Sequence, residues 1–238
     1  MSVRVFLAAA MAMLTLSACG GHESSNRAAC PAGKLCFELG NSSDLISLDP
    51  HQMTSVAESR VAQDTMVGLT QTGPSGEALP GMATSWETSA DGKVWTFHLR
   101  DAVWSDGVPV TSEDFAYALR RILDPKTAAE YASLLYVIKN AEPVNSGAMP
   151  VSALGVRTLG PRTLEITLEH PAPYILQLAK HQTMYPVPKH VVEKWGNKWS
   201  DPAHIVSNGP YKVRSWTLQK SVVADKNPLF WRVHDRTL

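Results

Sequence analysis

The chain has 238 residues, of which 44% are hydrophobic, so it is long enough to bury one large core or two smaller ones. Its 22 Lys and Arg residues balance 22 Asp and Glu residues, which gives a net charge of zero. This balance, without any basic stripe, argues against a nucleic-acid-binding protein, whose affinity depends on clustered Lys and Arg.

The N-terminus has the pattern of an exported lipoprotein. Arg4 precedes the apolar run 5–16, which is too short to span a bilayer, and Ser17, Ala18 and Cys19 follow. Leu-Ser-Ala-Cys resembles a bacterial lipobox, at which Cys19 would be lipidated after removal of residues 1–18 as a signal peptide. The alternative is an ordinary secretory signal in which Cys19 has no role.

Residues 19–35 are rich in Gly, Ser and Ala and are expected to form a flexible tether. Cys30 and Cys36 remain after signal removal. An oxidising compartment favours a disulfide between them, with two free thiols as the alternative. A metal site would need further ligands at matching spacing, and the sequence has none nearby.

Helical and extended patterns then follow one another without a regular βαβ rhythm, which predicts a mixed α/β or α+β fold. Trp95, Phe97 and Leu99 alternate with polar residues after the turn Asp91-Gly92, which is typical of a β-hairpin. The other elements expected before residue 104 are a strand at 35–39, a turn at 47–51 (SLDPH) and a helix at 55–69.

The stretch WSDGVPVTSEDFAYALRRILDP, residues 104–125, holds the strongest helix signal. Thr111 is a predicted N-cap with Asp114 at the third helical position, and Asp124-Pro125 ends the helix. A buried stripe is predicted at Phe115, Ala118, Leu119, Ile122 and Leu123. Capping and solvation, and not catalysis, are the expected roles of the charged residues Glu113, Asp114, Arg120 and Arg121.

The C-terminal half continues the mixture of elements. A turn at Gly160-Pro161 separates two predicted strands, of which the second covers 163–168. Asn208-Gly209 is expected to form a turn at the start of another strand. The other predicted elements are helices at 128–138, 174–178 and 188–196 and a strand at 221–225.

The sequence lacks the motifs of the common enzyme classes: G-x-S-x-G, H-E-x-x-H, the P-loop and the dinucleotide-binding glycine pattern. Asp106, Glu113 and Asp114 could serve as general acid and base only if they shared a cleft. The sequence therefore predicts a protein that is not an enzyme and has no cofactor.

Several long segments follow one another in a characteristic order. They resemble the family 5 extracellular solute-binding proteins, in particular the oligopeptide-binding receptors of ABC importers. The segments that carry this resemblance are 47–69, 79–125, 130–141, 154–178, 185–199 and 207–231.

The resemblance implies a fold like that of type II periplasmic binding proteins, in which two lobes close on a ligand. Residues 36–66 and 183–238 would form a discontinuous first lobe, and 67–182 a small scaffold subdomain. Family members continue far beyond Leu238, so the chain is expected to lack the second lobe. Residues 37–238 are accordingly expected to fold in part and to bind oligopeptides far more weakly than a complete receptor.

The resemblance also implies a binding site. The backbone of Thr54, Ser55 and Val56 would pair with an extended ligand, and Tyr131 would border that ligand. Close relatives can carry an acidic residue where this chain has Thr54, which weakens the inference that Thr54 recognises a ligand amino group. A packed helix aromatic is the alternative for Tyr131.

The expected partners are an oligopeptide and the permease subunits of an ABC importer, with membrane attachment only through Cys19 and a location in the periplasm or at the cell surface. Other ligands of the same family are the first alternative: a dipeptide, a murein peptide, a metal chelate or haem. A truncated product without transport function is the second.

Overall fold

The computed structural model describes residues 30, 32–33 and 35–232. The predicted signal peptide, residues 1–18, lies outside them. The chain divides into two compact units, Met1–Phe37 and Glu38–Leu238. Over the described residues, no helix is both long and apolar enough to cross a membrane.

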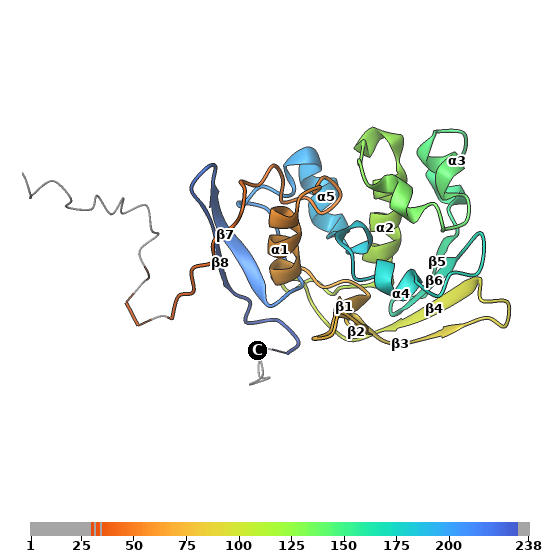
Figure 1. Cartoon of the computed structure of the whole chain (residues 1–238), viewed down its shortest axis with the longest axis horizontal. Coiled ribbons are helices and arrows are strands. Elements are labelled where there is room, and N and C mark those ends of the chain that lie inside the picture. Colours follow the sequence, from red (N-terminus) through yellow and green to blue (C-terminus); the bar gives the residue numbers. More distant parts are fainter. Residues whose placement is uncertain (1–29, 31, 34, 233–238) are drawn as a thin grey trace, which may run out of the picture. The chain divides into compact units, whose positions relative to one another are not determined.

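The largest sheet of the second unit has four antiparallel strands (Figure 1). The predicted hairpin is confirmed: Gly92 supplies the turn with a φ of +69°, and Trp95, Phe97 and Leu99 point into the core. The predicted pair around Gly160-Pro161 is confirmed as well. In sheet order the strands are β3 (Ala83–Thr88), β4 (Val94–Leu99), β6 (Thr163–Thr167) and β5 (Val156–Gly160).

Helix α2 (Ser112–Leu123) packs against β5 and β6 (Figure 1). Its start is the predicted capping box, in which the Thr111 N–H donates to Asp114 Oδ2 at 2.8 Å. The predicted stripe is confirmed, since all of its members are fully buried: Phe115, Ala118, Leu119, Ile122 and Leu123. Solvation is the wrong role for Arg121, which pairs with a buried carboxylate 72 residues away, that of Asp49.

Buried apolar side chains form two clusters. The larger lies between the sheet and α2 and comes from residues 67–184 with Phe230. The smaller combines side chains of α1 (Val56–Thr65), α5 (Lys189–Trp195) and the loops around Leu48 and Trp199. Helix α2 contributes to both, because its Ala118 belongs to the smaller cluster.

The apolar pattern predicts that the first helix extends to residue 69, but α1 ends at Thr65. The side chain of Asn208 accepts from the Val67 N–H at 3.0 Å and donates to the Val67 carbonyl at 2.9 Å. Gly209 donates its N–H to the Thr65 carbonyl, and a Cβ there would lie 2.5 Å from the Thr65 carbonyl carbon. The predicted turn at Asn208-Gly209 is therefore also the contact that stops α1.

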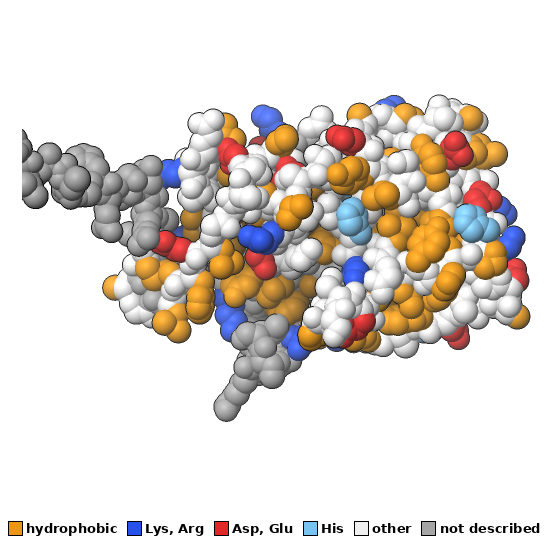
Figure 2. All heavy atoms as spheres, in the orientation of Figure 1, with side chains coloured by type: hydrophobic (Ala, Val, Ile, Leu, Met, Phe, Trp, Pro, Cys, Tyr) orange, Lys and Arg blue, Asp and Glu red, His pale blue; other side chains and the backbone are white. Residues whose placement is uncertain are grey.

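The two strands predicted near the C-terminus are confirmed as β7 (Tyr211–Thr217) and β8 (Ser221–Lys226), and they pair with each other as a hairpin. Within the part of the chain that the structure describes, they pair only with each other. Their outer edges therefore present backbone groups with which no described strand pairs. Figure 2 shows apolar side chains at the surface around this hairpin, and Tyr211 and Leu218 are among its exposed residues.

Two predicted elements are wrong. Residues 35–39 are not a strand: Leu35, Phe37 and Leu39 are exposed, and no described strand pairs with them. Residues 128–138 do not form an α-helix, because Ala128 has a φ of +50° and Ile138 bridges to Leu168 beside the sheet. The segment contains only the short 3₁₀ helix η2 (Ala132–Leu135).

The remaining elements are short. The predicted helices at 174–178 and 188–196 are present as α4 and α5. The helices and strands not yet given are β1 (Thr70–Thr72), β2 (Ala78–Pro80), η1 (Pro125–Thr127), α3 (Ala141–Asn145), η3 (Val151–Ala153), α4 (Ile175–Leu178), η4 (Gln182–Met184) and η5 (Gly196–Lys198).

Candidate ligand-binding site

The predicted ligand-pairing segment lies at the start of α1. Ser55 is the N-cap of this helix, and its Oγ accepts from the Glu58 N–H at 3.2 Å. Val56 is the first helical residue, and it is 76% exposed. Ser55 thus has a structural role as a cap, while Val56 presents an apolar side chain to the outside.

Thr54 and Tyr131, predicted from two separate parts of the sequence, are in contact. The Tyr131 hydroxyl donates to the Thr54 carbonyl at 2.9 Å, and both residues are half-buried. The Tyr131 ring also lies 6.3 Å from the His181 ring, centroid to centroid. The structure brings these residues together, and their contact with a ligand stays a prediction.

The backbone groups of Thr54 and Ser55 are already engaged within the chain. Both N–H groups donate to Glu58 Oε2, and the Ser55 carbonyl accepts from the N–H and the hydroxyl of Ser59. A carbonyl oxygen has two lone pairs, and the Thr54 carbonyl uses one of them for Tyr131. Of the two N–H groups and two carbonyls of Thr54 and Ser55, the Thr54 carbonyl is therefore the one that can still accept a hydrogen bond from a pairing strand.

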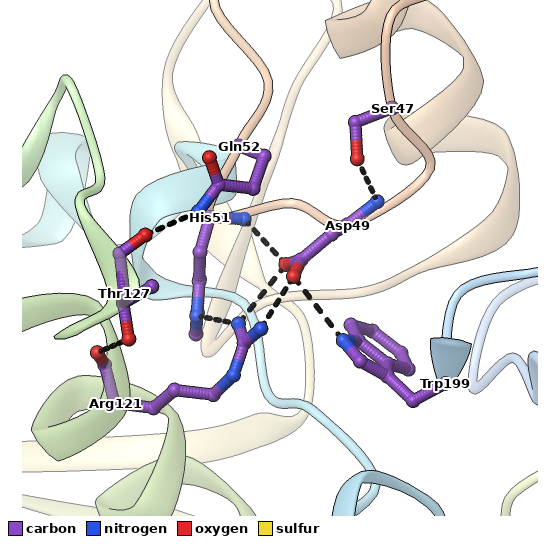
Figure 3. Close-up of polar contacts among 7 residues, drawn as sticks. All are labelled: Ser47, Asp49, His51, Gln52, Arg121, Thr127 and Trp199. Atoms are coloured by element: carbon purple, nitrogen blue, oxygen red, sulfur yellow. Dashed lines mark hydrogen bonds and ion pairs between the residues drawn. The ribbon is translucent and has the colours of Figure 1, made fainter. Parts of the chain in front are cut away.

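A buried ionic cluster joins the turn 47–51, which precedes this segment in the chain, to α2 (Figure 3). The Arg121 guanidinium donates through Nη1 to Asp49 Oδ1 at 3.1 Å and through Nη2 to Oδ2, and Trp199 donates its indole N–H to Oδ2 at 3.1 Å. Burial raises the pKa of Asp49, but the Arg121 guanidinium and the hydrogen bond from the His51 backbone N–H outweigh it and hold the pKa below its usual value. The ionised carboxylate thus ties the SLDPH turn to α2.

His51 completes the cluster as a neutral side chain. Its Nδ1 lies 2.7 Å from Nη1 of Arg121, and because a guanidinium can only donate, Nδ1 is the acceptor and the proton lies on Nε2. Burial lowers the pKa of His51 to about 3; the Asp49 carboxylate opposes this shift and Arg121 adds to it. His51 is therefore uncharged at neutral pH.

A polar cavity of about 370 Å³ lies beside the ion pair. Gln52 borders it and donates its side-chain N–H to the Thr127 carbonyl at 2.6 Å (Figure 3). The lining groups suit water or a small polar group: Ser47, Asp49, Gln52, Arg121, Lys126, Thr127, Asn197 and Ser200. The sequence indicated only a turn here, because burial of its Asp and His depends on residues far along the chain.

The three carboxylates considered as an acid–base set have other partners. Glu113 and Asp114 do line one cavity, of about 330 Å³. However, Glu113 pairs with Lys189 at 3.1 Å, and Asp106 lies 2.8 Å from the His190 ring. Asp114, whose pKa burial raises, accepts the N–H groups of the Thr111 and Lys189 backbone. Their visible roles are structural.

In the smaller unit, Cys30 and Cys36 are joined by a disulfide, with their Cα atoms 5.9 Å apart. Cys19, the predicted site of lipidation, lies outside the described residues.

We expect neither Cys30 nor Cys36 to react with a thiol reagent in exported protein that is denatured without reductant, since an oxidising compartment preserves disulfides. After reduction both should react, as alkylation followed by peptide mass spectrometry will show. The variant Cys30→Ser is the control, because it should leave Cys36 reactive in both conditions. Labelling of both cysteines before reduction would contradict the prediction.

Residues 77–237 match the family described as bacterial extracellular solute-binding proteins, family 5 (middle part). The chain belongs to this family.

Three proteins that are similar to this chain are oligopeptide-binding proteins. The periplasmic oligopeptide-binding protein OppA of Salmonella typhimurium is 45% identical over 203 residues, which are 84% of this chain and 37% of that protein. The crystal structure of a periplasmic oligopeptide-binding protein of Borrelia burgdorferi (OppAIV) superposes with a TM-score of 0.81 and 41% identity, covering 85% of this chain and 41% of that one.

OppA of Haemophilus influenzae, solved in complex with RPPGFSPFR, matches with a TM-score of 0.79 and 40% identity, over 82% of this chain and 38% of that one. The predicted fold class is therefore confirmed. The chain spans about two fifths of the length of the relatives that it matches.

Proposed function

We propose that this chain corresponds to the N-terminal part of a receptor that captures oligopeptides outside the cytoplasmic membrane and presents them to the permease subunits of an ABC importer. The observation that carries the proposal is the similarity to oligopeptide-binding proteins across more than four fifths of the chain. The contact between Tyr131 and Thr54 supports it, since it joins the two predicted parts of the site.

Peptide capture would rest on the main chain of the ligand. A receptor for varied peptides must hold the backbone, which is constant, and leave room for different side chains. A ligand N–H could donate to the second lone pair of the Thr54 carbonyl, with the Tyr131 ring at its side. Thr54 has no charge for a ligand amino group, so that group would be bound elsewhere.

We also propose the division into a discontinuous lobe, residues 36–66 and 183–238, and a scaffold subdomain, residues 67–182. The two buried clusters support it. The larger is built almost entirely from 67–184, and the smaller almost entirely from 45–66 and 185–213. Helix α2 lies at their border and would fix the two parts to each other.

The test of the proposed function is to isolate the protein from its own cells under native conditions and to identify by mass spectrometry what acid releases from it. We expect peptides of several residues with varied sequences. Calorimetric titration with an equimolar pool of tri- to pentapeptides should then show binding. Release of haem, a metal chelate or a single murein peptide would overturn the oligopeptide assignment and favour the corresponding relative in this family.

We propose that Cys19 carries a lipid anchor, and we expect Cys19→Ala to move the protein from the membrane fraction to the soluble fraction or to block its processing. A single acyl chain binds a membrane only marginally, so stable attachment takes two chains or one chain with a second signal. Immunoblots of fractionated cells measure this. The control Cys30→Ala leaves residues 16–19 intact and should remain membrane-bound. A processed, membrane-bound Cys19→Ala protein would refute the anchor.

A further inference from the structure

Glu58 is a completely buried carboxylate in the first turn of α1, with a side chain that is 0% exposed. Its Oε1 accepts the backbone N–H groups of Ile46 and Ser47 at 2.9 and 3.0 Å. Its Oε2 accepts the backbone N–H groups of Thr54 and Ser55 at 3.0 Å each, and the Ser55 hydroxyl at 2.9 Å. One carboxylate thus receives five hydrogen bonds.

These donors lie at the two ends of a single loop, residues 46–55. Each carboxylate oxygen serves one end, so Glu58 closes the loop in the way that a cross-link would. Residues outside the loop hold its middle. Arg121 donates hydrogen bonds to Asp49 and His51, and Gln52 donates one to the Thr127 carbonyl. The loop is therefore fixed internally by Glu58 and externally by α2 and η1.

The charge of Glu58 is stabilised by backbone dipoles. Burial raises its pKa, but the N–H groups of Thr54, Ile46 and Ser55 outweigh this effect and hold the pKa below its usual value. The start of α1 favours a negative charge at the same place. The shape of the loop thus depends on an ionised carboxylate that has no direct contact with the solvent.

We infer that Glu58 is a positioning residue for ligand capture: it holds loop 46–55 in the conformation that presents the Thr54 carbonyl to a peptide. This inference rests on the proposed function. The physical argument is that the Thr54 N–H is bound to Glu58 while its carbonyl faces Tyr131, so Glu58 fixes the orientation of the Thr54 backbone. A ligand that pairs with this carbonyl meets a preorganised acceptor and has less disorder to overcome.

The variant Glu58→Gln tests this with little change in volume. An amide group has one acceptor oxygen, and its NH₂ would face N–H donors that need an acceptor. At least two buried backbone N–H groups of the loop would then have no acceptor, which raises the free energy of this loop conformation. The loop should then open, whereas α1 keeps the Ser55 hydroxyl as a cap for the Glu58 N–H.

Asp114→Asn is the matched control. Asp114 is also buried at the third position of a helix, α2, and also accepts the backbone N–H and the hydroxyl of the N-cap residue, Thr111. In the described part of the chain, its hydrogen bonds go to Thr111 and Lys189, and none joins it to loop 46–55. The two variants therefore make the same chemical change at equivalent helix positions, and only one of them alters the proposed ligand loop.

Two measurements on the natively isolated protein separate the outcomes. Amide hydrogen exchange at Ile46, Ser47, Thr54 and Ser55 should be about tenfold faster or more in Glu58→Gln, and unchanged in Asp114→Asn, because a charged hydrogen-bond acceptor is lost. Affinity for the pool of tri- to pentapeptides should fall about tenfold in Glu58→Gln and stay within about twofold of wild type in Asp114→Asn. If Glu58→Gln does not fold, Glu58→Asp replaces it, with effects in the same direction.

Unchanged exchange at the four amides would overturn the claim that Glu58 holds the loop. Faster exchange with unchanged peptide affinity, or an equal loss of affinity in Asp114→Asn, would overturn its role in ligand capture. A wild-type protein that binds none of the peptides would overturn the proposed function and with it the capture role, while the exchange data alone would still decide whether Glu58 shapes the loop.

Discussion

Replacing Arg121 by Ala should destabilise the protein by about 3–5 kcal/mol, because it leaves a buried carboxylate without its partner. Asp49 is buried, and Arg121 donates to both of its oxygens and to the His51 ring. Without the guanidinium, Asp49 keeps the Trp199 indole and the His51 backbone N–H as donors. Chemical denaturation monitored by circular dichroism measures the loss.

The matched control is another ion pair of the same helix. Glu113 and Lys189 are 3.1 Å apart, with side chains that are 42% and 37% exposed. An exposed pair contributes about 0–1 kcal/mol, so Glu113→Ala should change the free energy of unfolding very little. Equal losses in the Arg121→Ala and Glu113→Ala variants would mean that the buried pair has no special role in stability.

The pH dependence gives a second readout of the same pair. The pKa of Asp49 is lower in the folded protein than in the unfolded chain, so its stabilising contribution is present above the unfolded pKa, near 4. It disappears as the pH falls through the lower, folded value. The difference in stability between wild type and Arg121→Ala should therefore shrink on acidification below about pH 4, and a difference that grows there would contradict this assignment.

Phe115→Ala should also cost about 3–5 kcal/mol, which corresponds to a fall in Tm of roughly 10 °C for a chain of this size. Phe115 is fully buried in the larger cluster, between α2 and the sheet, and its loss leaves a cavity. Thermal denaturation measures the effect. Phe37→Ala makes the same chemical change at a side chain that is 86% exposed, and it should have almost no effect. Similar shifts for both variants would contradict the placement of Phe115 in the core.

Elements with a strong local pattern were predictable from the sequence. The capping box and the apolar spacing of residues 111–123 are properties of neighbouring residues, and the structure has α2 at Ser112–Leu123. The alternation after Asp91-Gly92 likewise predicts β4, because successive side chains of a strand point to opposite sides. The resemblance, carried by the order of several long motifs, predicted the fold class.

Local patterns failed where the outcome depends on a partner. Residues 35–39 have the composition of a strand, but no described strand lies beside them to accept their hydrogen bonds. The predicted helix at 128–138 is broken by the left-handed Ala128 and by the bridge from Ile138 to Leu168, the residue after β6. The residues of each segment do not show whether a partner strand lies beside 35–39 or that Leu168 lies beside Ile138.

The sequence by itself determined the capped helix, the strand pairs around Asp91-Gly92 and Gly160-Pro161, the family, and the residues Thr54 and Tyr131 as candidates. Only the tertiary structure decided that Tyr131 binds the Thr54 carbonyl, that Arg121 is buried against Asp49, and that Asn208 stops α1. These contacts join residues 77, 72 and 141 positions apart. A hydrogen bond or ion pair between such residues depends on the packing of both clusters, and periodicity within a short window carries no information about it.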